Sequence, residues 1–136
     1  MDTITFSQSE KDAFRTMGVT GVILFGSQSR GMAGDASDYD FGVLRVRLDT
    51  DHEKDLYEGL YDLFSAKIGK IVDIDIVFLD AVPMELCHHV AKYGLALYEA
   101  IPGTFARFKE MVMDRYADFA PYRRMFQEHI LRRIPS

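Results

Sequence analysis

An apolar run, Val19–Phe25, stops abruptly at Gly26-Ser27, and this junction constrains the fold more than any other stretch of the chain. A run this short and this apolar is typical of a strand whose two faces are both buried. The chain then returns to Asp38 and Asp40, after which a second apolar stretch begins. Glycine has no Cβ, so another group can approach the backbone closely at Gly26. We therefore expect a corner at which one strand ends and the next begins.

The two carboxylates of Asp38-Tyr39-Asp40 indicate a site for a cation. They open a predicted strand over residues 38–46, and side chains at positions i and i+2 of a strand share one face. Like charges held that close repel each other unless a cation lies between them, and oxygen ligands suit Mg²⁺. The residues after Gly26-Ser27 can begin a short helix, whose N-terminal N–H groups attract phosphate. Together these features indicate metal-assisted chemistry on a nucleotide.

A third predicted strand, residues 71–79, adds two more carboxylates. Asp73 and Asp75 share one face of this strand, while apolar side chains occupy the other. A carboxylate in a buried strand is costly unless a metal, a basic partner or water accompanies it. Either aspartate is therefore a candidate to complete the group formed by Asp38 and Asp40, whereas Asp80 is better explained as a turn residue.

The spacing of these residues resembles a known signature. Gly26-Ser27 followed by Asp38-x-Asp40 is similar to the motif of the polymerase-beta-like nucleotidyltransferase superfamily. The accompanying Arg30-Gly31 and Ser37 resemble those of its small prokaryotic branch, the minimal nucleotidyltransferases. The resemblance covers residues 19–98 and extends more loosely to the C-terminus.

The resemblance implies a fold, a reaction and a set of residues. It implies an α/β (α+β) fold, with a small mixed sheet of three to five strands, helices on one face and C-terminal helices. It also implies Mg²⁺-dependent transfer of AMP from ATP, with two Mg²⁺ ions. The segment that ends at Pro83 matches the family best when Asp75 is the third carboxylate, and Asp73 is the runner-up. The implied site residues are the nucleotide-binding Gly26, Ser27 and Arg30, and the catalytic and metal-binding Asp38, Asp40 and Asp75.

Relatives of this kind act as antitoxins of helical HEPN-domain RNase toxins, so the resemblance implies a HEPN toxin as partner and one of its tyrosine hydroxyls as AMP acceptor. Two alternatives stay open. The chain resembles aminoglycoside nucleotidyltransferases in the same motif, and a third function is an antitoxin that neutralises by binding alone. A nucleic-acid polymerase is disfavoured because the chain shows no domain for holding a template or primer.

Secondary-structure patterns predict one domain over residues 1–136, with a core over 19–99 and a helical segment over 103–134. A capping box, Ser7 with Glu10, predicts a helix over 8–17. Pro121 should interrupt the last helix near Ala120 and divide it in two. The other elements that we expect are strands over 20–25 and 96–99 and helices over 51–68 and 84–93.

Composition limits the function classes. Hydrophobic residues make up 48% of the chain, which is enough for a core, and the net charge of −5 disfavours direct nucleic-acid binding through phosphate contacts. The lone cysteine, Cys87, fits a reducing cytoplasm, and no apolar run approaches the roughly 20 residues that span a bilayer. Residues 103–136 are more basic than acidic, which fits either a partner surface or a solvated helix face. Both homo-oligomers and hetero-oligomers remain open.

The Cys87-His88-His89 run has the ligand types of a zinc site but not the spacing. Adjacent residues on a helix diverge by about 100°, so these three side chains cannot converge on one ion. We therefore expect packing roles for them.

Overall fold

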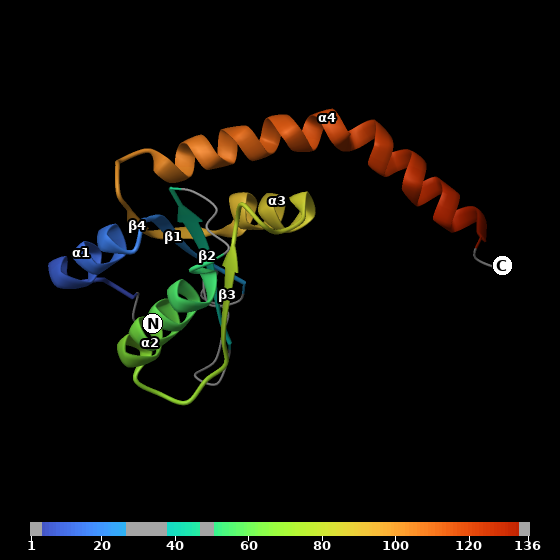
Figure 1. Cartoon of the computed structure of the whole chain (residues 1–136). Helices are drawn as coiled ribbons and strands as arrows, with labels where there is room; N and C mark the ends of the chain where they lie inside the picture. Colours follow the sequence, from blue (N-terminus) through green and yellow to red (C-terminus); the bar gives the residue numbers. More distant parts are fainter. Residues whose placement is uncertain (1–3, 27–37, 47–50, 134–136) are drawn as a thin grey trace.

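The computed structural model describes residues 4–26, 38–46 and 51–133, with side chains up to residue 118 (Figure 1). Within these ranges no helix is long and apolar enough to cross a membrane. The structure has four helices and four strands there. The helices are α1 (Gln8–Thr16), α2 (Glu53–Ile68), α3 (Met84–Tyr93) and α4 (Thr104–Arg133), and the strands are β1 (Val19–Phe25), β2 (Tyr39–Arg45), β3 (Ile74–Phe78) and β4 (Leu95–Glu99).

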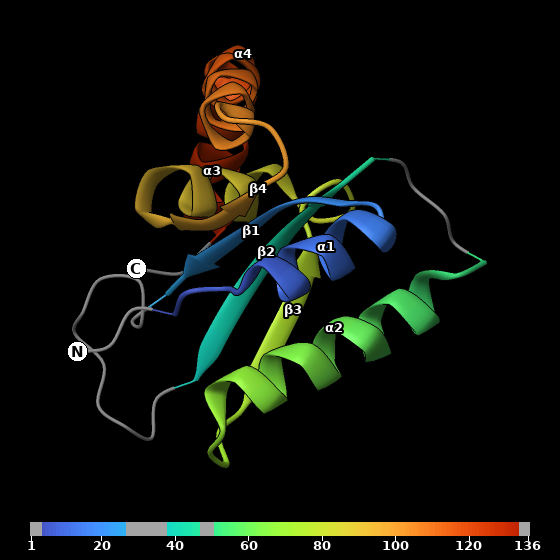
Figure 2. The same ribbon diagram turned by 90° about the vertical axis from the view of Figure 1, so that its left-hand side faces the viewer.

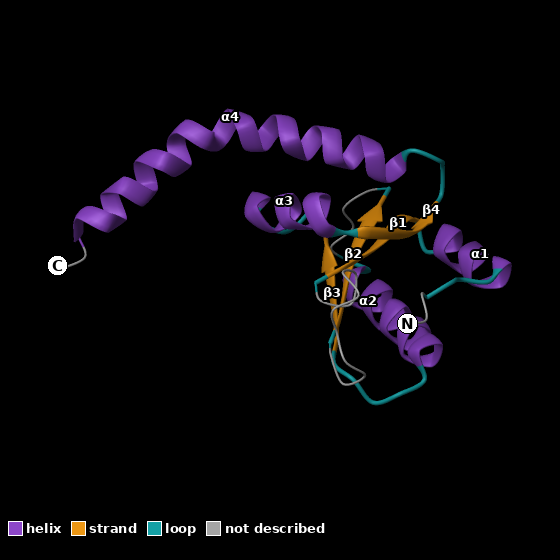
Figure 3. Cartoon of the chain, turned by 180° about the vertical axis from the view of Figure 1, so that it is seen from behind, coloured by secondary structure: helices purple, strands orange, loops and turns teal. Residues whose placement is uncertain are grey.

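The four strands form one mixed sheet in the order β3-β2-β1-β4 (Figure 3). β1 is antiparallel to both of its neighbours, β2 and β4, whereas β2 and β3 are parallel. The mixed sheet and the helices around it confirm the predicted fold class. β2 therefore starts at the end of the sheet at which β1 ends and β3 starts.

One face of the sheet is covered by α1 and α2 and is rich in aromatic side chains (Figure 2). The Phe41 and Phe64 rings stack with centroids 4.1 Å apart, and the Phe6 and Phe14 rings meet edge to face at 4.9 Å. Phe14, Phe41 and Phe64 are all almost completely buried. Aromatic pairs of this kind add to the burial of apolar surface, so this face is a packed core.

The other face is covered by α3 and α4, which corrects the expectation that helices lie on one face only (Figure 2). The reason lies in β1, where Val22 and Leu24 point into the first core and Ile23 and Phe25 into the second. All four side chains are buried, so each face of this strand needs a cover. The apolar run had indicated this burial, but not which helices supply it.

Local signals place most element boundaries well. The capping box at α1 is present: the Ser7 N–H donates to Glu10 Oε1 at 2.7 Å, and the Glu10 N–H donates to Ser7 Oγ at 3.2 Å. α3 follows Pro83 as predicted. Both β2 and β3 are shorter than predicted, because their expected first residues, Asp38 and residues 71–73, precede the paired segments.

The last helix contradicts the prediction of two helices. α4 runs without interruption from Thr104 to Arg133, through Pro121. Proline removes one helical hydrogen bond and tends to kink a helix, which does not require the helix to end. Figure 1 shows α4 passing over α3 in its first half and extending beyond the rest of the molecule in its second half.

Candidate active site

The sheet brings the predicted carboxylates together at one end of its strands. Phe25, the last residue of β1, is the register partner of Asp40 near the start of β2. Asp40 in turn is the register partner of Asp75 on the parallel strand β3. Asp38 directly precedes β2. Residues that lie far apart in the chain are therefore neighbours at the beginning of β2.

Gly26 makes the close approach that the sequence predicted. Its φ is +82°, a left-handed conformation that glycine adopts without strain. A Cβ at this position would collide with Oδ2 of Asp40. Both the backbone angle and the carboxylate therefore require glycine where β1 ends.

The electrostatics of Asp40 show that the carboxylates are crowded. Burial raises the pKa of Asp40, and the nearby charges of Asp75 and Asp38 raise it further. His89 on α3 acts in the opposite direction and lowers the same pKa. A raised pKa means that the folded protein disfavours the charged carboxylate at this position. Negative charge is therefore concentrated at the beginning of β2, and the described residues compensate it only weakly.

This donor set fits a hard divalent cation. Carboxylate oxygens are the ligands that Mg²⁺ prefers, and repulsion among Asp38, Asp40 and Asp75 would be relieved by positive charge. Among the described residues, no group of three or more His, Cys, Asp or Glu side chains already has the geometry of a metal site. The chemistry of the three carboxylates thus suits a cation, while their assignment as metal ligands stays a prediction.

The two candidates for the third carboxylate occupy different places. Asp75 lies within β3 beside Asp40 and influences its pKa. Asp73 precedes β3, and its backbone carbonyl accepts a hydrogen bond from the Tyr39 N–H at 3.0 Å. The structure therefore brings Asp75 next to Asp40 and gives Asp73 a backbone contact at the strand entrance. The catalytic role of Asp75 remains a prediction.

Ser27 and Arg30, the other predicted nucleotide contacts, lie outside the described residues. Sequence reasoning missed His89 on α3. The centroid of its ring lies 6.2 Å from that of the Phe25 ring, and its charge influences Asp40. The helical pattern of α3 gave no signal for this position, because at about 100° per residue His89 points well away from Cys87, Val90 and Ala91, which face the core.

The Cys87-His88-His89 run diverges as helical geometry requires. The Cys87 thiol is buried and donates to the Leu79 carbonyl at 3.3 Å. The His88 ring stacks on Tyr116 with centroids 3.7 Å apart, whereas His89 faces Phe25. Each of the three side chains therefore has its own surroundings.

At the opposite end of β2, charges are paired within the chain. Arg45 Nε donates to Oδ2 of Asp80 and Nη2 to Oδ1, each at 2.9 Å, which is a bidentate ion pair. The guanidinium also lies over the Phe78 ring, 4.0 Å from its centroid. Asp80, which the sequence indicated only as a turn residue, therefore fixes the end of β2 to the turn after β3.

Comparison with known proteins adds a family and a set of similar folds. The family model for polymerase beta, nucleotidyltransferase, matches residues 10–101. No curated protein sequence matches the chain.

Three solved structures show the same fold in toxin–antitoxin complexes. A toxin–antitoxin structure with AMP-PNP aligns at 22% identity and a TM-score of 0.69, covering 92% of this chain and 99% of that one. A MntA-HepT toxin–antitoxin structure aligns at 19% identity and a TM-score of 0.62, covering 92% and 99%. A tri-AMPylated Shewanella oneidensis HEPN toxin in complex with MNT antitoxin aligns at 20% identity and a TM-score of 0.62, covering 91% and 98%.

Proposed function

Because the chain belongs to the polymerase-beta nucleotidyltransferase family, we propose that it transfers AMP from ATP to a hydroxyl group of a partner protein. The observation that carries this proposal is the meeting of Asp38, Asp40 and Asp75 beside Gly26. The corner offers negative charge for a cation and a backbone that another group can approach. Nucleotidyl transfer needs both, because a charged triphosphate must be held against an attacking hydroxyl.

Asp38, Asp40 and Asp75 would hold Mg²⁺, two ions by analogy with the family. Such ions, when bound, neutralise triphosphate charge and lower the pKa of an attacking hydroxyl. The protein contributes the positions of the carboxylates. Hydrogen-bonded pairing fixes Asp40 between β1 and β3, so its carboxylate cannot move far from that of Asp75.

The other proposed roles follow from position. Gly26 lets the phosphates approach the end of β1, with Ser27 and Arg30 proposed as further contacts. Asp75 accepts the proton of the attacking hydroxyl, since it is the exposed carboxylate of β3 at this edge. The hydroxyl oxygen attacks the α-phosphorus of ATP, the bond from this phosphorus to the β-phosphate bridge breaks, and pyrophosphate leaves. Holding acceptor and nucleotide in line then supplies much of the rate enhancement.

The proposed partner is a HEPN-type toxin, and the proposed acceptor is one of its tyrosines. Support comes from the structural neighbours, among them an AMPylated HEPN toxin in complex with MNT antitoxin. In this proposal the chain acts as the antitoxin, and adenylylation silences the toxin. The basic second half of α4, which extends beyond the sheet, is available for such a partner (Figure 1).

The test is a transfer assay with α-labelled ATP and Mg²⁺. The protein is incubated alone and with the product of the neighbouring gene, beside an Asp38→Asn/Asp40→Asn variant. Label on the partner protein that is lost with the variant is the expected result. A folded variant that labels the partner as well as the wild type does would contradict the mechanism.

The same variant separates catalysis from binding. If the Asp38→Asn/Asp40→Asn protein still neutralises the toxin in growing cells as well as the wild type does, then the protein acts by binding alone. An aminoglycoside in place of the partner protein tests the small-molecule alternative, and its labelling would replace the proposed acceptor class.

A further inference from the structure

Two aromatic side chains of α3 lie beside the carboxylates, on the same face of the sheet. Phe25 and Asp40 are register partners on β1 and β2, so their side chains share one face, with Cβ atoms about 5 Å apart. Phe25 points into the core beneath α3, where its ring lies 6.2 Å from that of His89 between centroids. The Tyr93 ring follows on α3, 5.0 Å from the His89 ring. The rings of His89 and Tyr93, here called the ring pair, therefore border the carboxylates.

The ring pair lies on the β1 side of the carboxylates. The sheet order β3-β2-β1-β4 places Asp75 on one side of Asp40 and β1 on the other. The end of α3 packs closely on β1, because a Cβ at Gly94 would collide with the side chain of Ile23. In the proposed reaction Asp75 serves the acceptor, and the end of β1 serves the phosphates. The ring pair is therefore on the side of the donor nucleotide.

Both rings of the pair reach the surface. Tyr93 is 38% exposed and His89 is partly buried, whereas the neighbouring His88 is stacked on Tyr116 of α4. The exposed Lys92 lies over the Tyr93 ring, 5.3 Å from its centroid. An exposed cation–π contact contributes about two- to fivefold to an affinity, and a stacked base about five- to 150-fold. A base can therefore displace this flexible lysine from the ring.

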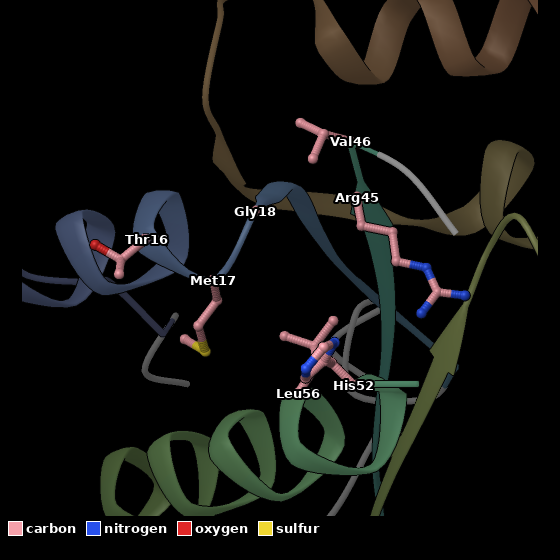
Figure 4. A pocket seen from close by; sticks show the side chains of 7 residues that line it. All are labelled: Thr16, Met17, Gly18, Arg45, Val46, His52 and Leu56. Carbon is pink, nitrogen blue, oxygen red and sulfur yellow. The ribbon is translucent and has the colours of Figure 1, made fainter. Parts of the chain in front are cut away.

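Flat rings beside a nucleotide site match the chemistry of a base. Every nucleobase has a π face, so it can stack on an aromatic side chain without being read by hydrogen bonds at its edge. The pocket in Figure 4 is in a different part of the molecule, between α1, α2 and the end of β2. Arg45, which lines it, is roughly 17 Å from Asp40 along the strand, at about 3.3 Å per residue.

We propose that the ring pair stacks against the base of the donor nucleotide whose triphosphate binds at the carboxylates. This inference rests on the proposed nucleotidyl transfer and adds to it the residues that hold the base. His89 and Tyr93 bind the nucleotide and take no part in the movement of protons.

The test measures the dissociation constants of two probes for the protein alone, by calorimetric titration with Mg²⁺ present. The probes are ATP and tripolyphosphate, which has three phosphates but neither ribose nor base. Tyr93→Leu removes one ring and keeps an apolar side chain. It should weaken ATP binding about tenfold and leave tripolyphosphate binding unchanged. Tyr93→Phe keeps the ring and should bind ATP as the wild type does.

Tyr61→Leu is the matched control. Tyr61 is 39% exposed and forms a stacked pair with Tyr57 on α2, which covers the other face of the sheet. This variant should leave the affinity for both probes unchanged. ATP binding that is unaffected by Tyr93→Leu, or equal weakening of both probes, would overturn the inference alone. A wild-type protein that binds neither probe would contradict the proposed function and this inference together.

A measurement on the wild type keeps the test independent of any variant. A stacked base shifts the NMR signals of the ring protons that it covers, because its own ring current acts on them. ATP should therefore move the ring signals of Tyr93 upfield, and tripolyphosphate should leave them in place. Equal shifts with both probes, or no shift with ATP at a saturating concentration, would overturn the proposal.

Discussion

The two ends of the β2–β3 pair differ in whether their charged side chains are compensated. At the end of β2, Arg45 meets Asp80 in a bidentate ion pair, so positive and negative charge compensate each other within the chain. At the beginning of β2, Asp40 lies beside Asp75 and near Asp38, and burial together with these like charges raises the pKa of Asp40. The same two parallel strands thus carry a stabilising contact at one end and a destabilising one at the other.

The difference separates structure from function. A charge pair that is complete within the chain fixes the register of two strands and needs nothing from outside. Carboxylates that repel each other in the folded state reduce stability, and such arrangements occur where a ligand or a reaction uses them. In this protein the crowded end coincides with the nucleotidyltransferase motif, which is why we propose that the transfer reaction takes place there.

The largest expected effect concerns the third carboxylate. Asp75→Asn should lower AMP transfer by about 10²–10⁴-fold, the usual range when a general base is lost. Asp73→Asn is the matched control, since it changes the same side chain two residues earlier and outside β3. Initial rates with α-labelled ATP measure both variants. A larger loss for Asp73→Asn would assign the role to Asp73, and equal losses would contradict the assignment to Asp75 alone.

At the compensated end of β2, a substitution should lower the stability of the protein rather than its rate of AMP transfer. Asp80→Ala removes one partner of the Arg45 ion pair and leaves a guanidinium that is 3% exposed. Breaking a buried pair costs about 3–5 kcal/mol, and because Asp80 is partly exposed we expect about 2 kcal/mol. Urea unfolding measures this loss. The rate of AMP transfer per folded molecule should stay near that of the wild type. A large loss of AMP transfer without a loss of stability would contradict the distinction between the two ends.

A smaller effect is expected at Glu10, a second compensated carboxylate. The hydrogen bond from the Ser7 N–H lowers the pKa of Glu10 from its ordinary 4.5, and Lys67, at 3.0 Å, contributes in the same direction, while burial opposes both. Because the folded pKa is lowered, the stabilisation is complete above about pH 4.5 and is lost as the pH falls through the folded value. Glu10→Gln should therefore cost about 0.5–1 kcal/mol at pH 7 and progressively less below pH 4.5.

Urea unfolding of Glu10→Gln between pH 7 and pH 3 checks this dependence. Glu58→Gln is the control, because Glu58 pairs with Lys54 at 3.9 Å on an exposed helix face. Exposed pairs of this spacing contribute about 0.3–0.5 kcal/mol, so the control should change stability less. A cost for Glu10→Gln that does not vary with pH would show that the lost contact is not electrostatic.

The sequence predicted what local patterns determine. Alternation along residues 71–79 predicted that Asp75 lies on the face opposite Ile74, Ile76 and Phe78, and the capping box predicted the start of α1. The apolar run before Gly26 predicted a strand buried on both faces, and β1 is that strand. These features depend on residues that are close together in the chain, so each can be predicted from a single segment of the sequence.

Long-range contacts could not be predicted in the same way. Asp80 and Arg45 are distant in the chain, and only the parallel pairing of β2 with β3 brings them together. The position of His89 near Asp40 depends on how α3 crosses the second face of the sheet. The continuation of α4 through Pro121 depends on the whole helix rather than on the proline alone. The contacts of Ser27 and Arg30 remain predictions.

The most direct test of the contrast between the two ends is the stability of Asp40→Asn with and without Mg²⁺. Asn removes the repulsion between paired like charges, so without Mg²⁺ the variant should be more stable than the wild type by roughly 0.2–1 kcal/mol. Mg²⁺ at ten times its Kd should stabilise the wild type by about 1.4 kcal/mol and the variant much less, which reverses the order. A variant that is less stable than the wild type without Mg²⁺, with no response of either protein to the ion, would contradict the account.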